Sequence, residues 1–337
     1  MGMPLLFVEE PDCEFAKKYY PGLNAGIAEF MQFNKEFLIE NFDVLFMSDL
    51  WAREDFHEQY KILENKYNKR LRTVYCPHGF SDKGFYLKDC AKEDITLVYG
   101  QNMIDLFRLE KVYERLHSYV LTGNYRYTYY KQNKPFYDKL VQEEIFNKLD
   151  KSKPTILYAP TWLDAEESTT FFDVPNMLFS QLPNEYNMIV KLHPRLELDD
   201  VAKYYHIVGT FEEKANILFI KDFPVYPLLD ASDIFISDLS AIAYDFLPFN
   251  RPMFFLNKHR RNSKKDRGLY IYRCGVEVLP EDFGNIYQII EKNRDAEKFA
   301  KIKAETYLYT FGNERPFPEI KQDIVAAFST DDKYPPR

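Results

Sequence analysis

The chain has 337 residues, of which 46% are hydrophobic, and a formal net charge of −8 at pH 7. This length is too great for one ordinary core and fits two domains of roughly 150 residues each. The negative charge argues against a general nucleic-acid binder, which needs a basic surface to displace counterions. No run of about 18 apolar residues occurs, so the sequence predicts no membrane span.

The spacing of the cysteines and the absence of several known motifs exclude further classes of protein. The four cysteines are scattered and form no CxxC pair, so neither a zinc site nor a disulfide framework is expected, and a reducing cytoplasm fits best. No basic and then apolar segment opens the chain, so no secretory signal is expected. GxGxxG, Walker A, GxSxG and HExxH motifs are absent, and we therefore expect no cofactor and no metal.

The first half alternates apolar runs with helical patterns. Leu5–Val8 could form a first strand, although acidic residues and a proline follow it at once. Further strands are predicted at Val44–Met47, Arg72–Cys76, Ile95–Tyr99 and Tyr119–Thr122. Helices are predicted at Ala25–Glu40, Glu58–Tyr67 and Met103–Leu116. This alternation is typical of a parallel, doubly wound sheet.

The second half restarts the pattern after a polar segment, Lys131–Lys153, which we take as the crossing between domains. Its strands are predicted at Thr155–Ala159, Met188–Leu192, Ile217–Ile220, Ile234–Ser237 and Met253–Leu256. Its helices include Ala241–Pro248, Ile286–Asn293 and a C-terminal tail from Asp295 to about Leu308. The sequence therefore predicts an α/β protein of two Rossmann-like, doubly wound domains, residues 1–148 and 149–337, which face each other across a cleft.

Residues that follow the strands carry the chemical information, because ligands of open α/β sheets sit at the carboxyl ends of strands. In the first half, His78 and Gly79 follow one strand and Arg126 follows another. His78 is either a turn residue that caps a carbonyl or a general base, since imidazole titrates near neutral pH. Arg126 is either an ordinary surface residue or a ligand of the substrate.

The second half offers three such turns. Thr161 follows one strand, His193 and Arg195 follow the next, and Asp238 and Ser240 precede a predicted helix. A hydroxyl, an imidazole, a guanidinium and the first amides of a helix are all suited to bind phosphate. The alternatives are a structural histidine beside a surface arginine and a simply capped helix.

Two oppositely charged loops stand out. The loop after Thr161 carries Asp164, Glu166 and Glu167 and would repel phosphate unless a cation intervenes. The loop after Leu256 is basic, from Lys258 to Arg267, and is either a solvated surface or an anion-binding loop.

Several segments of the chain together resemble the CDP-glycerol glycerophosphotransferases of the teichoic-acid primase and polymerase type. The segments are His78-Gly79, Gly123–Arg126, YAPTW at Tyr158–Trp162, KLHPR at Lys191–Arg195, the run Ala231–Phe246, Arg251-Pro252 and Arg267–Tyr270. Their order and spacing match the family over about residues 70–275. Ala241, where the family often has a second hydroxyl residue, and the basic loop after Leu256 depart from the pattern.

The resemblance implies a GT-B fold and transfer of glycerol phosphate from CDP-glycerol, with release of CMP, in cell-surface polymer synthesis. His78 and His193 would be catalytic, His78 as the general base and His193 at the donor phosphates. Substrate-binding residues would be Gly79, Arg126, Thr161, Arg195, Asp238 and Ser240. If His78 is not the base, Asp82 is the nearest substitute.

Implied partners are CDP-glycerol or a related nucleotide donor, and a glycan, glycolipid or polyol-phosphate acceptor, but no nucleic acid. The implied location is the cytoplasm, with at most peripheral contact at the inner face of the cell membrane. The alternatives are a nucleotide-sugar glycosyltransferase or 2-epimerase of the same fold, and a non-catalytic nucleotide-binding protein.

Overall fold

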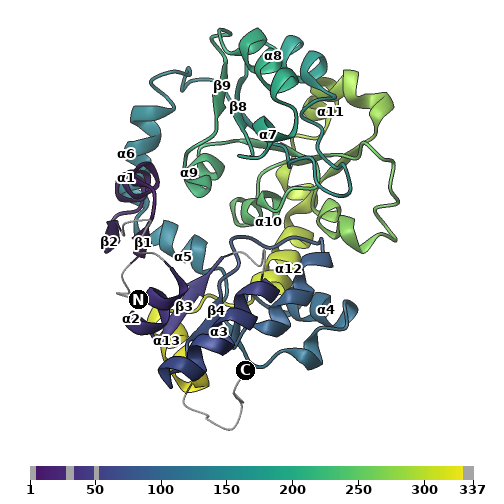
Figure 1. The fold of residues 1–337 in the computed structure, drawn as a ribbon. Coiled ribbons are helices and arrows are strands. Elements are labelled where there is room, and N and C mark those ends of the chain that lie inside the picture. Colours follow the sequence, from purple (N-terminus) through teal and green to yellow (C-terminus); the bar gives the residue numbers. More distant parts are fainter. Residues whose placement is uncertain (1–4, 28–33, 49–52, 329–337) are drawn as a thin grey trace. The chain divides into compact units, whose positions relative to one another are not determined.

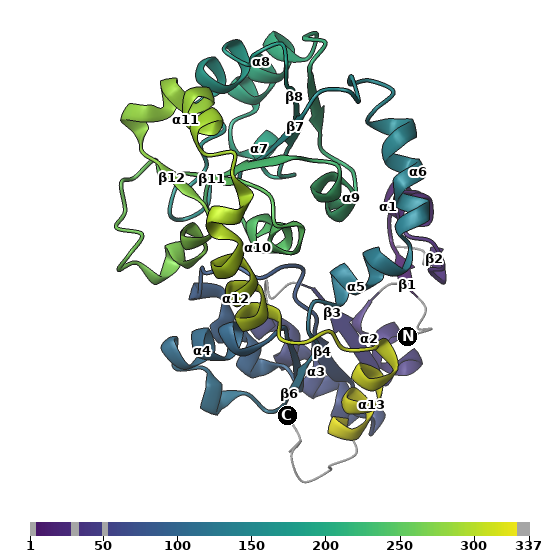
Figure 2. The same ribbon diagram turned by 180° about the vertical axis from the view of Figure 1, so that it is seen from behind.

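A computed structural model of the chain describes residues 5–27, 34–48 and 53–328. The chain forms two compact units (Figure 1 and Figure 2). The first holds the described residues up to His78, then Lys83–Thr128 and the residues from Thr310 on. The second holds Gly79–Asp82 and Tyr129–Tyr309. This division differs from the predicted boundary after residue 148, because the end of the chain returns to the first unit and residues 129–148 belong to the second.

The first unit contains a four-stranded parallel sheet of order β3-β4-β5-β6 and a separate parallel pair, β1 and β2. The strands are β1 (Leu5–Phe7), β2 (Ala25–Ile27), β3 (Val44–Met47), β4 (Arg72–Tyr75), β5 (Ile95–Val98) and β6 (Tyr119–Leu121). The helices are α1 (Glu10–Tyr19), α2 (Lys35–Asn41), α3 (Arg53–Tyr67), α4 (Gln101–Leu109) and α13 (Phe317–Phe328), with 3₁₀ turns at Phe85–Lys92 and Tyr113–Arg115. Helix α5 (Tyr125–Gln132) carries the chain into the second unit, and α12 (Ala300–Phe311) brings it back.

The C-terminal helix α13 explains why the end of the chain belongs to the first unit. Its Ile320 and Ile324 are buried in one cluster with Val74, Leu97 and Val120 of the sheet. Figure 1 and Figure 2 both show α13, in yellow, alongside these strands. Burying two isoleucines stabilises the packed state by roughly 3–6 kcal/mol before entropy is counted.

The second unit is built on a six-stranded parallel sheet of order β12-β11-β10-β7-β8-β9. The strands are β7 (Thr155–Ala159), β8 (Asn187–Lys191), β9 (Ile217–Ile220), β10 (Ile234–Ser237), β11 (Met253–Leu256) and β12 (Val276–Val278). The helices are α6 (Lys134–Glu144), α7 (Leu196–Asp199), α8 (Val201–Phe211), α9 (Val225–Asp230), α10 (Ile242–Phe246) and α11 (Ile286–Lys292). Shorter helical turns lie at Asn176–Ser180, Leu247–Phe249, Arg267–Cys274, Pro280–Asn285 and Ala296–Phe299.

Strand order in the second unit marks the place where a ligand is expected. From β7 the chain moves outward through β8 and β9, then returns to the other side of β7 and continues through β10 to β12. The direction of winding therefore reverses between β7 and β10. Ligands of open α/β sheets bind at such a reversal, beyond the carboxyl ends of the strands. Thr161 follows β7 and Asp238 follows β10.

The structure confirms all nine interior strands predicted after Leu5–Val8, within one residue at each end, and also the parallel arrangement. The predicted helix Ala25–Glu40 is wrong at its start, because Ala25–Ile27 is a strand and the helix begins after Asn34. The side chain of Asn34 accepts a hydrogen bond from Phe37 N at 2.9 Å, which caps that helix. Residues 28–33 of the predicted helix lie outside the described part of the chain. The elements α1, α13 and β12 were not predicted.

The helix expected at Met103–Leu116 is also too long. It ends at Leu109, and Lys111 then adopts a left-handed φ of 57°. A residue in that conformation ends a helix. Within residues 5–27, 34–48 and 53–328, no helix combines the length and apolarity that crossing a bilayer requires.

Candidate functional site

His78 lies exposed in the turn that follows β4 of the first unit. Its Nδ1 is 3.1 Å from the carbonyl oxygen of Ser48, the residue after β3. A carbonyl oxygen only accepts hydrogen bonds, so Nδ1 carries the proton and donates it. In the neutral ring, Nε2 then holds a lone pair. This is the tautomer that a general base needs.

Two tyrosines, the buried Tyr99 and the partly buried Tyr125, hold the peptide that precedes His78. The hydroxyl of Tyr99 donates to the carbonyl oxygen of Pro77 at 2.7 Å, and the hydroxyl of Tyr125 donates to the same oxygen at 2.5 Å. The two rings stack at 5.6 Å between centroids. The carbonyl oxygen of Pro77 therefore accepts two hydrogen bonds, which limit movement of the turn. Neither tyrosine was predicted as part of the site, although Tyr99 directly follows β5 and Tyr125 begins the helix after β6.

Arg126 belongs to the same region of the first unit. Burial raises the pKa of the Cys76 thiol, and the hydrogen bond between Cys76 and Tyr125 and the charge of Arg126 oppose that rise. The guanidinium therefore lies near the end of β4, on the strand that leads to His78. The turn that precedes Arg126 requires a glycine at position 123. Gly123 has a φ of +63°, and a Cβ there would lie 2.9 Å from the carbonyl oxygen of Asn313.

In the second unit, Asp238 joins the two loops at the winding reversal. It is 1% exposed. Its Oδ1 accepts from Thr161 N at 2.8 Å, and its Oδ2 accepts from the amide and hydroxyl of Thr170 at 2.8 and 3.0 Å. These bonds fold the loop after β7 over the end of β10. The geometry makes Asp238 a residue that positions this loop, and a direct contact with substrate stays a prediction.

Ser240 lies in the turn between Asp238 and a short helix. The predicted helix Ala241–Pro248 is only α10, Ile242–Phe246, followed by a 3₁₀ turn. The hydroxyl oxygen of Ser240 is 3.4 Å from Ile242 N. A helix this short has a weak dipole, so peptide and hydroxyl groups, more than the dipole, would have to hold a phosphate here. Ser240 lines a small pocket with Ser81, Asp82 and Gly268.

His193 and Arg195 form a cluster with Trp162 beyond the ends of β7 and β8. Arg195 N donates to Nδ1 of His193 at 3.2 Å. The guanidinium of Arg195 lies 4.1 Å from the centre of the Trp162 ring, and the His193 ring lies 6.2 Å from it. Because Nδ1 of His193 accepts, its neutral ring carries the proton on Nε2. Stacking on tryptophan also holds Arg195 in place.

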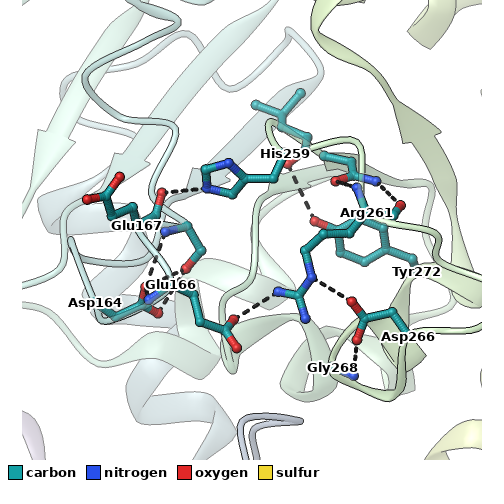
Figure 3. A network of polar contacts seen from close by, with 11 residues as sticks. Asp164, Glu166, Glu167, His259, Arg261, Asp266, Gly268 and Tyr272 are labelled. Atoms are coloured by element: carbon teal, nitrogen blue, oxygen red, sulfur yellow. Dashed lines mark hydrogen bonds and ion pairs between the residues drawn. The ribbon is translucent and has the colours of Figure 1, made fainter.

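The acidic and basic loops pair with each other, as Figure 3 shows. Arg261 donates from Nη1 to Glu166 at 2.9 Å and from Nε to Asp266 at 2.6 Å. His259 lies 3.1 Å from the carbonyl oxygen of Glu167. We call Glu166, Arg261 and Asp266 the loop clasp. In the clasp, the positive charge of Arg261 offsets part of the negative charge of the acidic loop.

Other cations of the basic loop are also paired. Lys258 lies 2.8 Å from Asp173, and Arg260 lies 3.1 Å from Glu281. Most of the charge that marked this loop as an anion-binding candidate is thus balanced within the second unit. Within the described residues, no group of three or more histidine, cysteine or acidic side chains could hold a metal ion.

The predicted site residues are divided between the units. His78 and Arg126 belong to the first unit, whereas Gly79, Thr161, His193, Arg195, Asp238 and Ser240 belong to the second. The structure brings Thr161 and Asp238 into contact and groups His193 with Arg195.

Comparison with known proteins gives this arrangement a family. The family described as CDP-Glycerol:Poly(glycerophosphate) glycerophosphotransferase matches residues 78–305 of the chain. The chain belongs to this family. The match begins at His78 and covers all the site residues predicted in the second unit.

Sequence relatives agree with the family. The chain is 27% identical over 238 residues to the teichoic acid glycerol-phosphate primase of Bacillus subtilis (strain 168). The aligned region covers 63% of this chain and 57% of the primase. The chain thus spans little more than half the length of that relative.

Among solved structures, the wall teichoic acid polymerase TagF has a TM-score of 0.61 at 15% identity and covers 98% of this chain and 81% of its own. A further TagF structure comes from a soak with CDPG. The complex of S. aureus MnaA with UDP has a TM-score of 0.56 at 13% identity and covers 97% of this chain and 95% of its own. At such identities the likeness shows the fold alone. TagF and MnaA are GT-B-type enzymes, so the predicted GT-B fold of two Rossmann-like units is confirmed.

Proposed function

We propose that the chain transfers glycerol phosphate from CDP-glycerol, or a related polyol phosphate from its CDP form, to an acceptor hydroxyl and releases CMP. The acceptor is a polyol phosphate, a glycan or a glycolipid of a cell-surface polymer. Membership of the glycerophosphotransferase family supports the reaction class. The names of the relatives, teichoic acid primases and polymerases, support the polymer.

The observation that carries the proposal is the hydrogen-bonding state of His78. Its Nδ1 is committed to the carbonyl oxygen of Ser48, 3.1 Å away, which leaves Nε2 as the proton acceptor. An acceptor hydroxyl attacks the phosphorus that bears glycerol and passes its proton to Nε2. A new P–O bond forms as the P–O bond to CMP breaks. A positioned base of this kind contributes roughly 10²–10⁴ to such a rate.

The second unit would hold the donor. Negative charge grows on CMP as it leaves, and phosphoryl transfer depends mostly on positioning and on balancing that charge. His193 offers a donor from Nε2, and Arg195 offers a guanidinium beside it. Ser240 and Thr161 flank the winding reversal, where the pyrophosphate would bind. Gly79 and Arg126 keep the substrate-binding roles that the sequence predicts.

The proposal includes where the protein acts. A donor of this kind is a soluble nucleotide, which places the reaction in the cytoplasm. The acceptor, if it is a glycolipid, requires peripheral contact with the inner face of the membrane. With a net charge of −8 the chain has no general attraction to nucleic acid.

A CMP-release assay tests the proposal. The purified chain is incubated with CDP-glycerol and a short glycerol-phosphate acceptor, and in parallel with CDP-ribitol, UDP-N-acetylglucosamine and CMP-sialic acid. We expect CMP release with a CDP-polyol only, and growth of the acceptor by one unit of matching mass. Turnover of the UDP-sugar would instead assign a glycosyltransferase or 2-epimerase. Stabilisation of the fold by nucleotides without turnover of any donor would assign a binding protein.

A further inference from the structure

The segment that directly follows His78 is anchored by a buried carboxylate. Asp82 is 7% exposed, and both of its carboxylate oxygens lie 2.7 Å from the hydroxyl of Tyr244. Arg267 donates from Nη1 to the same carboxylate, and Ile271 N donates to it at 3.3 Å. Burial raises the pKa of Asp82 to about 6, and the charge of Arg267 limits the rise. A buried charge is tolerated only with such partners.

A second side chain of the segment attaches to the same tyrosine. Phe80 is 2% exposed, and its ring meets the ring of Tyr244 edge-on at 4.7 Å between centroids. The ring of Tyr244 thus packs against Phe80, and its hydroxyl donates to Asp82. These contacts explain why Gly79–Asp82 packs with the second unit although the residues on both sides pack with the first.

The anchored segment also forms part of the pocket that Ser240 lines. Ser81 and Asp82 line it from one segment, and Ser240 and Tyr244 line it from the turn and helix after β10. Gly268 and Ile271 complete it from the turn that carries Arg267. One carboxylate is therefore bonded to both of the other segments that surround the pocket.

We infer that Asp82 is a positioning residue: through Tyr244 and Arg267 it fixes the segment after His78 against the turn that carries Ser240. Its oxygens are occupied by these donors, so it does not replace His78 as the base. The kinetic consequence of the inference rests on the proposed function, but the anchoring does not. Misplacing a reacting group by about 1 Å is enough to lower a rate on the order of 10²-fold.

The test combines proteolysis with kinetics on Asp82→Asn and Tyr244→Phe. Tyr244→Phe keeps the ring that holds Phe80 and removes only the hydroxyl, so it is expected to fold even if Asp82→Asn does not. Trypsin cuts after Lys83, which adjoins the anchor. We expect the fragment that ends at Lys83 to form roughly ten times faster in the variants, since cleavage follows local opening. We expect kcat for CMP release to fall roughly 10–100-fold, with KM for CDP-glycerol changed less than kcat.

The matched controls are Asp230→Asn and Tyr130→Phe. Asp230 also accepts from a tyrosine hydroxyl, Tyr130 at 2.6 Å, and pairs with a cation, Lys134 at 2.8 Å, but it does not line the pocket. These variants are expected to leave cleavage after Lys83 and kcat unchanged. Unchanged cleavage and kcat in folded Tyr244→Phe would overturn the inference. Faster cleavage together with a wild-type chain that releases no CMP would retain the anchor and reject the proposed function.

Discussion

The turn after β4 in the first unit and the turn after β8 in the second both present a histidine, yet they hold it in opposite states. Nδ1 of His78 donates to a carbonyl of the neighbouring strand end, whereas Nδ1 of His193 accepts from the amide of Arg195 in its own turn. One ring therefore offers a lone pair at Nε2 and the other offers a proton. The backbone group that reaches Nδ1 decides what each histidine can do.

A second contrast separates residues whose polar atoms are hydrogen-bonded within the protein from residues that keep a polar atom unbonded. The carboxylate of Asp238 accepts three hydrogen bonds from the loop that it positions. Nε2 of His78 has no partner among the described residues. A motif residue whose polar atoms are all engaged supports the site, and one with an open position is available for chemistry.

The largest effect should come from removing His78, the proposed general base. His78→Ala is expected to lower kcat roughly 10²–10⁴-fold while the affinity for CDP-glycerol stays nearly unchanged. Turnover and nucleotide affinity are measured on the same preparation, by CMP release and by calorimetry.

His117→Ala, an exposed histidine of the same unit, is the control and should behave as wild type. If the affinity of His78→Ala falls in step with its turnover, His78 is a binding residue and the contrast with His193 is lost.

The next effect should come from removing His193, the proposed hydrogen-bond donor of the second unit. His193→Ala is expected to lower turnover roughly 10²–10³-fold, the scale of losing one preorganised donor to a developing charge. The melting temperature should stay close to wild type, because the residue lies in a turn beyond the strand and not in the core. The exposed His206, on α8 of the same unit, provides the control as His206→Ala. A large drop in melting temperature would make His193 structural.

Asp238→Asn tests the supporting role. The amide can accept where one carboxylate oxygen did, but its NH₂ group then meets donors of Thr170. Leaving buried donors without an acceptor costs about 1–3 kcal/mol. Urea denaturation should show a loss of about 3 kcal/mol, with unfolding starting in the loop after β7. A fully stable variant with weak nucleotide binding would instead make Asp238 a ligand of the donor.

Much of the fold could be predicted because buried parallel strands leave a plain signal. Runs such as Ile234–Ser237 are continuous, apolar and bounded by turn residues, and every strand of this kind was found. The strands β2 and β12 have three residues each and no such signal. The return of α13 to the first unit is invisible locally, because its amphipathic pattern does not say which sheet it covers.

The candidate site residues were chosen by their position and stay predictions as functional residues. Strand-end positions pointed to His78, His193 and Ser240, but no sequence pattern told which of their atoms would form hydrogen bonds within the protein. Arg251 shows the limit, since Arg251-Pro252 was one of the segments that carried the family resemblance, but the resemblance did not say what the arginine does. Its Nη1 donates to the carbonyl oxygens of Asp230 and Ser232 at 2.6 and 2.5 Å and closes the end of α9. Contacts between distant segments decide such roles.

The second unit also contains a partly buried lysine just before the His193 turn. Lys191 donates to the carbonyl oxygen of Lys221 at 2.5 Å, and burial lowers its pKa to about 8 from an ordinary 10.5. Between these two values the unfolded chain binds more protons, so this group's contribution to stability rises with pH. The free energy of unfolding of wild type minus that of Lys191→Met should increase by up to about 1 kcal/mol per pH unit from pH 8 to 10. A flat difference would mean that Lys191 is not desolvated.

The smallest effect should come from breaking the loop clasp. It tests whether the paired loops of the second unit contribute to stability and donor binding as its strand-end turns do. Arg261 is paired with Glu166 and Asp266, and the three side chains are between 25% and 35% exposed. Ion pairs at that exposure contribute up to about 1 kcal/mol and weaken in salt. Arg261→Gln should therefore lower the free energy of unfolding by about 1 kcal/mol in low salt, and by less in roughly 0.5 M NaCl.

A matched control separates the clasp from charge alone. Arg260 is the neighbouring residue, has one ion pair, with Glu281, and is 61% exposed, so Arg260→Gln should change stability little. Arg261 also reaches the pocket indirectly: Asp266 accepts from Gly268 N at 2.9 Å, and a Cβ at Gly268 would lie 2.6 Å from Nη2 of Arg261. Releasing the clasp should thus raise KM for the donor severalfold, because Gly268 lines the pocket with Ser240. Equal effects of the two arginine variants on stability and KM would show that the loops contribute only charge, and that the turns alone define the site.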